Sequence, residues 1–461
     1  MRFKIFLLAL VSILIGYLGS WWGFDIHQAI AIAVFSMSIL STLFFWEFRV
    51  SFVFIGTGIL LLTRSTDIEH VLRFASLDVI FFLIGMMILV GLLKDAGFFF
   101  WITSLPLRIK KLTGIKLFIL LMAISAFLSC LMDEVTSIIV MTKVVLDISD
   151  FLEITPVPLL ISCVLATNIG STGTVIGNPI GVLIAARGNL TFEDFISRSM
   201  PVTIVILIIT IAIVLYWYRN YIKEVSRVLS TCNEDKTFLY LMSISPDART
   251  KVGMGIFAAA ILCIALHHRI ESLFGLEENT LLLMAPLIFA GVAMIYRHDK
   301  ARHFIEKDIE WNSLLFFMFL FAMAGTIRYI GIADFFAMKI VKNIGNSPGL
   351  LSGVVLFSSG IISSMLDNVV VVASYIPVIK SLQTLHVNMK PLWWALLFGA
   401  CYGGNITLIG STANIVAIGI LEKERKIKIG FLEWFWVGLT VGIISMIIAA
   451  AAVILLPIYK T

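Results

Sequence analysis

The sequence is poor in charge. Only 14% of its 461 residues are charged, where an average soluble domain carries roughly 25%. Hydrophobic residues make up 60%, and the interior of a soluble protein of this length cannot hold that much apolar surface. The bilayer must therefore act as the solvent. The apolar runs are continuous rather than alternating, which favours spanning helices over a β-barrel.

The sequence also lacks the usual patterns of a metal site, a disulfide framework or an enzyme centre. Its five cysteines are scattered without paired spacing, and its seven histidines are dispersed, so neither disulfides nor a resident metal is expected. It has no HExxH motif and no nucleophile with an adjacent base, which argues against a membrane-embedded enzyme. The basic residues behind the net charge of +5 lie in short loops between spans, so no nucleic-acid partner is expected. No cofactor is expected either.

Long apolar segments are what the sequence has instead. We count about eleven full crossings, each near the 20 residues that a spanning helix needs, and two longer interrupted segments. The N-terminal apolar segment starts like a signal peptide but lacks a convincing cleavage site, so a retained first helix is expected. These features predict an all-α polytopic membrane protein, surrounded by membrane lipid.

Basic residues gather in alternate loops. The richest loops are residues 108–111, 219–251, 297–307 and 423–428. If the N-terminus is cytoplasmic, all of these loops are cytoplasmic, as the positive-inside rule requires. The sequence therefore predicts a multi-pass protein of a plasma or inner membrane with a cytoplasmic N-terminus.

Two interrupted segments, residues 115–150 and 347–383, each hold two apolar arms around a polar tip, LMDEVTS and MLDNVVV. An arm of about 15 residues is short for a span, and a charged residue at mid-membrane costs at least about 2.5–3.5 kcal/mol. Both facts favour a re-entrant hairpin whose tip is shielded by protein. A helix pair with a polar turn in a loop is the alternative.

The two halves of the chain repeat each other. Ser129 and Asp133 recur as Ser363 and Asp367, 234 residues further along, and the Gly91/Gly97 pair recurs at the same offset. An odd number of crossings separates the copies, so the repeats are expected to be inverted, which is typical of secondary transporters. The predicted division is N-terminal scaffold 1–65, repeat 1 66–222, cytoplasmic linker 223–251 and repeat 2 252–461.

Each hairpin is followed by a glycine-rich segment, residues 157–186 and 391–421, which predicts a helix broken at mid-membrane. An unwound stretch frees backbone carbonyls for Na+ and exposes a helix N-terminus for an anion. A small-residue packing face is the alternative. The polar side chains of these breaks are candidate ion or substrate ligands: Asn168, Ser171, Thr172, Thr174, Asn178, Asn405, Thr407, Ser411, Thr412 and Asn414.

Asp133, Glu134 and Asp367 are acids within apolar segments. An unpaired carboxylate at this depth is too costly, so each should bind a cation or hold a proton. The alternative is that they cap the hairpin helices. The predicted Na+ ligands are Asp133, Asn168, Asp367 and Asn405, with Thr136 and Asn368 beside the tips. Lys94 and Arg328 lie near span ends, where snorkelling to the interface is expected.

The segments LMDEVTSIIVMTKVV, NIGSTGTVIGNPIG, SSMLDNVVVVASYIPVI and GACYGGNITLIGSTANIV resemble the ion-transporter superfamily. The nearest branch is the arsenite/anion permease, NhaD antiporter and melanosomal P-protein group, which is similar to citrate transporters. The resemblance implies hairpin-containing repeats, a homodimer and elevator-like motion, with the ion and substrate sites at Asp133, Glu134, Asp367 and Asn368 and in the breaks. Two motifs depart from that branch, since Asp133-Glu134 replaces Asp-Asn and GNPIG replaces GDPPN.

Together these patterns predict an ion-coupled secondary transporter driven by Na+ or protons. The solute is a small inorganic or organic ion. Acidic tips favour cation/proton exchange, whereas glycine-rich backbone amides favour an anion permease or a Na+-coupled carboxylate or oxyanion symporter. A passive channel is the alternative within membrane transport.

Overall fold

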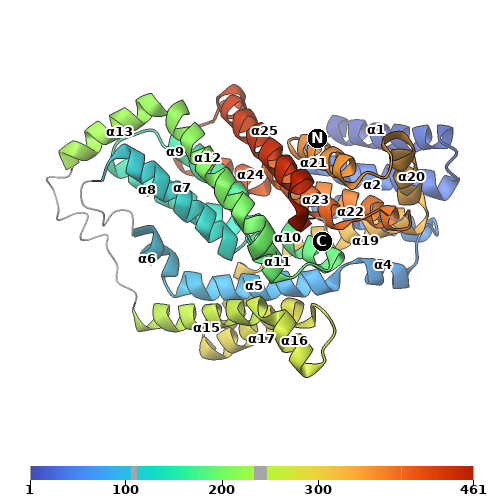
Figure 1. Cartoon of the computed structure of the whole chain (residues 1–461), viewed down its shortest axis with the longest axis horizontal. Helices are drawn as coiled ribbons and strands as arrows, with labels where there is room; N and C mark the ends of the chain where they lie inside the picture. Colours follow the sequence, from blue (N-terminus) through green and yellow to red (C-terminus); the bar gives the residue numbers. More distant parts are fainter. Residues whose placement is uncertain (1, 105–111, 233–246, 386, 460–461) are drawn as a thin grey trace.

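The computed structural model describes residues 2–104, 112–232, 247–385 and 387–459 (Figure 1). Throughout these ranges the regular structure is helical, with no strand, which confirms an all-α polytopic membrane protein. Eight of the described helices are long and apolar enough to cross a membrane, or nine if one bent pair counts as a single span. The sequence-based count of about eleven is higher because it included broken and shorter helices, such as Thr280–Tyr296.

The N-terminal helices form one end of the molecule (Figure 1). Helix α1 (Arg2–Trp21) packs against α2 (Ile26–Phe44), which packs against α3 (Arg49–Leu62), and a short α4 (Ile68–Phe74) follows. Asp25 starts α2 with a capping box, because its carboxylate accepts the Gln28 N–H at 2.8 Å while Gln28 accepts the Asp25 N–H. Gln28 also donates to the Ile330 carbonyl at 2.7 Å, which ties this end to the second half of the chain.

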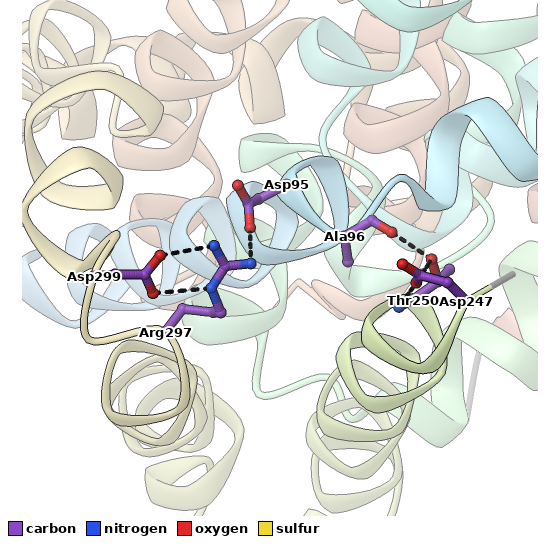
Figure 2. A network of polar contacts seen from close by, with 6 residues as sticks. All are labelled: Asp95, Ala96, Asp247, Thr250, Arg297 and Asp299. Atoms are coloured by element: carbon purple, nitrogen blue, oxygen red, sulfur yellow. Dashed lines mark hydrogen bonds and ion pairs between the residues drawn. The ribbon is translucent and has the colours of Figure 1, made fainter.

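Helix α5 (Leu77–Asp95) lies beside α15 (Ala248–Ala265) and α17 (Thr280–Tyr296), with the short α16 (His267–Phe274) between the latter two in sequence (Figure 1). A methyl group on Gly85 would come within 2.5 Å of the Pro286 backbone, so α5 and α17 touch through their main chains. Figure 2 shows the polar contacts that join the end of α5 to the start of α15 and to the residues after α17. Arg297 pairs with Asp95 and Asp299, and the Thr250 hydroxyl donates to the Ala96 carbonyl.

Both interrupted segments are helix pairs with short turns. Helix α7 (Gly114–Leu131) is followed after two residues by α8 (Glu134–Phe151), and α21 (Pro348–Ser363) is followed after four by α22 (Asn368–Gln383). The partners of each pair pack on one another. A short α6 (Phe98–Ser104) precedes the first pair, and α20 (Ile332–Ile344) precedes the second, bent by 119° relative to α21.

Each glycine-rich segment is interrupted. Helix α9 (Val157–Gly170) ends eight residues before α10 (Pro179–Gly188) begins, and α23 (Lys390–Gly403) ends before α24 (Thr412–Arg425). The residues between are buried almost throughout. Irregular backbone at membrane depth needs such cover, because lipid cannot satisfy its hydrogen bonds.

The remaining helices pack against parts of these pairs. They are α12 (Met200–Trp217), α13 (Arg219–Cys232), α19 (Trp311–Tyr329) and α25 (Phe431–Leu455), with one-turn segments α11 (Phe192–Asp194) and α18 (Ala301–His303). The predicted linker, residues 223–251, begins inside α13, ends inside α15, and lies between them outside the described residues. The division into inverted repeats stays a prediction.

Candidate functional site

The aspartates of the two hairpin tips are helix caps. Asp133 starts α8 by accepting the backbone N–H groups of Val135 and Thr136 at 3.0 and 2.9 Å, and the Thr136 hydroxyl at 2.6 Å. Asp367 starts α22 by accepting the Val369 N–H at 3.0 Å, and it also accepts the Thr412 hydroxyl. The capping alternative is therefore correct for both aspartates. Capping leaves lone pairs on each carboxylate, so it does not conflict with ion binding.

Glu134 differs from its neighbours because its carboxyl group is incompletely paired. The residue is 3% exposed. One carboxyl oxygen accepts a long hydrogen bond of 3.4 Å from the Ser411 hydroxyl, and the other, Oε2, makes no hydrogen bond within 3.5 Å in the described part of the chain, while the Ser171 hydroxyl lies close enough to interact with the carboxyl group. Glu134 lies within electrostatic range of both Asp133 and Asp367. The structure thus brings the acidic residues of both tips into one buried region.

An amide cluster joins the two broken helices next to Glu134. The Asn168 amide nitrogen donates to the side-chain oxygens of Asn405 and Asn414 at 2.8 and 2.9 Å, and its oxygen accepts the Ser411 hydroxyl at 3.2 Å. These four residues are fully buried. Asn168 is more than 230 residues away in sequence from the other three, so only tertiary packing could bring it to them.

The tips are attached to the breaks by matching contacts in the two halves. The Ser129 hydroxyl donates to the Thr167 carbonyl at 2.8 Å, and the Ser363 hydroxyl donates to the Ala400 carbonyl at 2.7 Å. In the same way, the hydroxyl of Thr174 donates to the Cys130 carbonyl, and that of Thr407 donates to the Ser364 carbonyl. Thr174 and Thr407 therefore hold each tip against its break.

The other predicted residues have defined roles around the cluster. Asn178 caps α10 by accepting the Gly181 N–H at 2.6 Å, and it donates to the Ser171 hydroxyl at 2.9 Å. Thr172 meets the hydroxyls of Thr203 and Tyr402, each at 2.9 Å. The Asn368 amide lies 2.7 Å from the Ser363 hydroxyl, so it joins the second tip to its own helix pair. All of these predicted residues are buried.

A profile of the family described as citrate transporter matches residues 41–399 of the chain and again residues 309–460. The chain belongs to the citrate transporter family. An uncharacterized transporter of Mycobacterium tuberculosis is 28% identical over 376 residues, which cover 81% of this chain and 85% of the relative. A 46 kDa membrane protein of Mycobacterium leprae is 28% identical over 380 residues, covering 81% and 84%.

The human P protein is 26% identical over 447 residues, covering 82% of this chain but only 53% of the P protein. The predicted resemblance to the citrate-transporter-like P-protein branch is thereby confirmed. The family and the named relatives indicate that this member of the citrate transporter family is a multi-pass membrane transporter, and they point away from an enzyme.

Sequence analysis missed Arg49 of this transporter. Arg49 is 4% exposed, and its guanidinium carbon lies 3.8 Å from the ring centroid of Trp46 and 5.0 Å from that of Phe316. It donates to the Ser313 hydroxyl at 3.0 Å and lies within electrostatic range of Asp367 and Glu310. The available signal was a single arginine next to an apolar run, at the start of α3.

The described residues contain no group of three or more His, Cys, Asp or Glu side chains placed to hold a metal ion. The oxygens near Glu134 belong to the Ser411 hydroxyl, the Asn168 amide and the carboxylates of the two tips, and hard oxygen donors of these kinds suit a monovalent cation. Lys94 lies away from this region. It is 65% exposed and pairs with Asp308 at 3.1 Å, as expected for a lysine that extends to the interface.

Proposed function

We propose that this protein is an ion-coupled secondary active transporter in which Glu134 carries the coupling Na+ or proton. The observation that supports this most strongly is a buried carboxyl group with one unpaired oxygen, Glu134 Oε2. Burying an ionised carboxylate without a partner is very costly. The group therefore either holds a proton or binds a cation, and an exchange between these states is what ion coupling requires.

The groups around Glu134 can complete a cation site. Ser411 and Asn168 contribute oxygens from the two breaks, and Asp133 and Asp367 add negative charge from the two tips. Because both tips and both breaks contribute, relative movement of these elements would open the site to one side or the other. Alternating access between inverted repeats, in a homodimer with cytoplasmic N-termini, is part of the proposal.

The solute has two candidates, each supported by a different observation. Acidic groups at the centre favour cation/proton exchange. The family description favours a carboxylate anion, as do the N-termini of α10 and α24, which begin next to the cluster at Asn178 and Ser411 and carry partial positive charge. We give preference to cation-coupled movement of a small carboxylate, because two independent observations support it.

Glu134→Gln tests the coupling role. Glutamine keeps the shape of the side chain but can neither release a proton nor supply a carboxylate to Na+. In proteoliposomes with imposed Na+ or pH gradients, we expect gradient-driven citrate or succinate uptake to fall at least 100-fold. The protein should still purify as a folded species with an unchanged helical spectrum.

The matched control is Glu424→Gln, the same change at an exposed position of α24. Its uptake should stay within about twofold of wild type, since surface substitutions away from a site usually have small effects. Gradient-driven uptake by Glu134→Gln at the wild-type rate would remove Glu134 from the coupling mechanism.

A further inference from the structure

A second polar cavity lies away from the hairpin tips. Its volume is about 660 Å³, within the range of about 300–1,000 Å³ that small-molecule sites occupy. Its walls come from α4, α10, α19, α20 and α22. Its cationic lining residues are Arg73, Arg187, Arg328 and Lys380, with His70 beside them, and its acidic lining residue is Asp334.

The cations of this cavity are largely without carboxylate partners. Arg187 pairs with Asp78 at 3.2 Å and donates to the Ser76 hydroxyl at 2.6 Å. No carboxylate in the described part of the chain lies within ion-pair distance of Arg73, Arg328 or Lys380. Counting Asp78 and Asp334 against the four cations leaves a net charge of about +2 when His70 is neutral. Lys380 also lies within electrostatic range of Arg187 and Arg328, so like charges face one another across the cavity.

The cavity is separate from the Glu134 region. Lys380 follows Asp367 by thirteen residues on the same helix, which is about 20 Å at 1.5 Å per residue. Arg328 lies at the end of α19 and Arg187 at the end of α10. The predicted orientation places all of these ends on the non-cytoplasmic side, where basic residues are normally depleted. A cluster of cations on that side therefore needs an explanation other than topology.

We infer that this cavity is an anion-binding site for a small solute with two or more negative charges. Such an anion would relieve the repulsion among Arg187, Arg328 and Lys380, and guanidinium groups are well shaped for carboxylate and sulfate oxygens. A monovalent anion would leave positive charge uncompensated. The site deepens the proposed function: it is an outer capture site where a solute anion concentrates before it reaches the centre.

The site also bridges different parts of the molecule. Arg73 and Arg328 belong to α4 and α19, which pack on one another, whereas Arg187 and Lys380 belong to the second part of a broken helix and to a hairpin arm. A polyvalent anion held by all four would connect the hairpin elements to the surrounding helices. Binding should therefore raise the melting temperature of the whole protein.

The test is calorimetric titration of the purified protein in detergent, at fixed Na+ and pH, with citrate, succinate, sulfate and acetate. We expect citrate to bind most tightly, acetate to bind at least 10-fold more weakly, and all affinities to fall as ionic strength rises. Lys380→Gln and Arg328→Gln should each weaken citrate binding at least 10-fold, whereas Lys380→Arg, which keeps the charge, should stay within about threefold of wild type.

Two controls separate this site from others. Lys342→Gln, at an exposed position of α20 outside the cavity lining, should bind citrate as wild type does. Glu134→Gln should also keep citrate affinity at the cavity even if it abolishes coupled uptake, so failure of the coupling role and failure of this site give different results.

Three results would overturn the inference. They are wild-type citrate affinity in both Lys380→Gln and Arg328→Gln, equal affinity for acetate and citrate, or stabilisation by phosphatidylglycerol nanodiscs with no response to any soluble anion. The last result would assign the cavity to a lipid headgroup.

Discussion

Glu134 and Asn368 stand at the same position of the two hairpins, each directly after the capping aspartate and 234 residues apart. Their surroundings differ, because the Asn368 amide meets the Ser363 hydroxyl at 2.7 Å whereas Glu134 keeps an unpaired oxygen. The two tips are therefore alike in backbone and unlike in charge. Glu134 therefore has no titratable counterpart at the matching position of the second hairpin, and under the proposed function this asymmetry assigns the coupling ion or proton to the first hairpin.

At the scale of single residues, Arg49→Met tests whether the buried guanidinium balances the charge of the acids near it. The change removes a buried cation within electrostatic range of Asp367 and Glu310, together with its hydrogen bond to the Ser313 hydroxyl, and a hydrogen bond to a charged group contributes roughly 1.5–3 kcal/mol. We expect a loss of stability of about 3 kcal/mol, measured by denaturant titration in detergent. Arg425→Met is the control: it breaks a more exposed ion pair with Asp150, where a loss below about 1 kcal/mol is expected. Equal midpoints for the two variants would contradict the role given to Arg49.

At the scale of helices, two glycines decide how closely the hairpins approach the broken helices. A methyl group on Gly170 would lie 2.3 Å from the Ala126 carbonyl oxygen of α7, and one on Gly403 would lie 2.2 Å from the Gly360 carbonyl oxygen of α21. The small-residue packing alternative is therefore correct for these glycines. The same close approach permits the hydrogen bonds of Ser129 and Ser363, so packing and site are parts of one arrangement.

We expect Gly170→Ala and Gly403→Ala each to destabilise the protein by about 1–3 kcal/mol, because a backbone atom cannot move aside as a flexible side chain can. Each should also reduce gradient-driven uptake, since the tip would be displaced from its break. Gly291→Ala in α17 is the matched control, with no atom within 4 Å of the added methyl, and should be neutral or stabilising by up to about 1 kcal/mol. Similar destabilisation by all three would contradict the role given to the close backbone contacts, because helix propensity alone favours alanine over glycine at each position.

At the scale of the whole molecule, the two halves are connected at the centre by side chains rather than by sequence neighbours. Asn168 reaches both Asn405 and Asn414, and Glu134 reaches Ser411. If the repeats are inverted, the open ends of the two hairpins must lie on opposite sides of the membrane. That arrangement predicts different accessibility for the loops beside them.

Cysteine labelling in intact cells tests this topology. In a variant with its five native cysteines replaced by alanine, we expect Asn346→Cys to react with an impermeant maleimide from outside. Glu153→Cys should react only after permeabilisation. Both positions are exposed, and they lie beside the second and first hairpins, respectively. Labelling of both from the same side would contradict inverted repeats and the predicted orientation together.

The sequence by itself determined the membrane class, the positions of both hairpins and both helix breaks, and most residues of the central cluster. These follow from local physics, because apolar length, glycine content and isolated acids are visible without knowing what packs against them. Asp133 as a cap was also foreseeable, since Asp commonly starts helices.

Only the tertiary structure decided which of these residues remain unpaired. It showed that Thr174 and Thr407 attach the tips to the breaks, that Glu134 rather than either aspartate has an unsatisfied oxygen, and that Arg49 is buried near the acids. It also gathered Arg73, Arg187, Arg328 and Lys380 around one cavity. Such groupings depend on contacts between residues hundreds of positions apart, and the cost or benefit of a charge depends on those contacts more than on its neighbours in sequence.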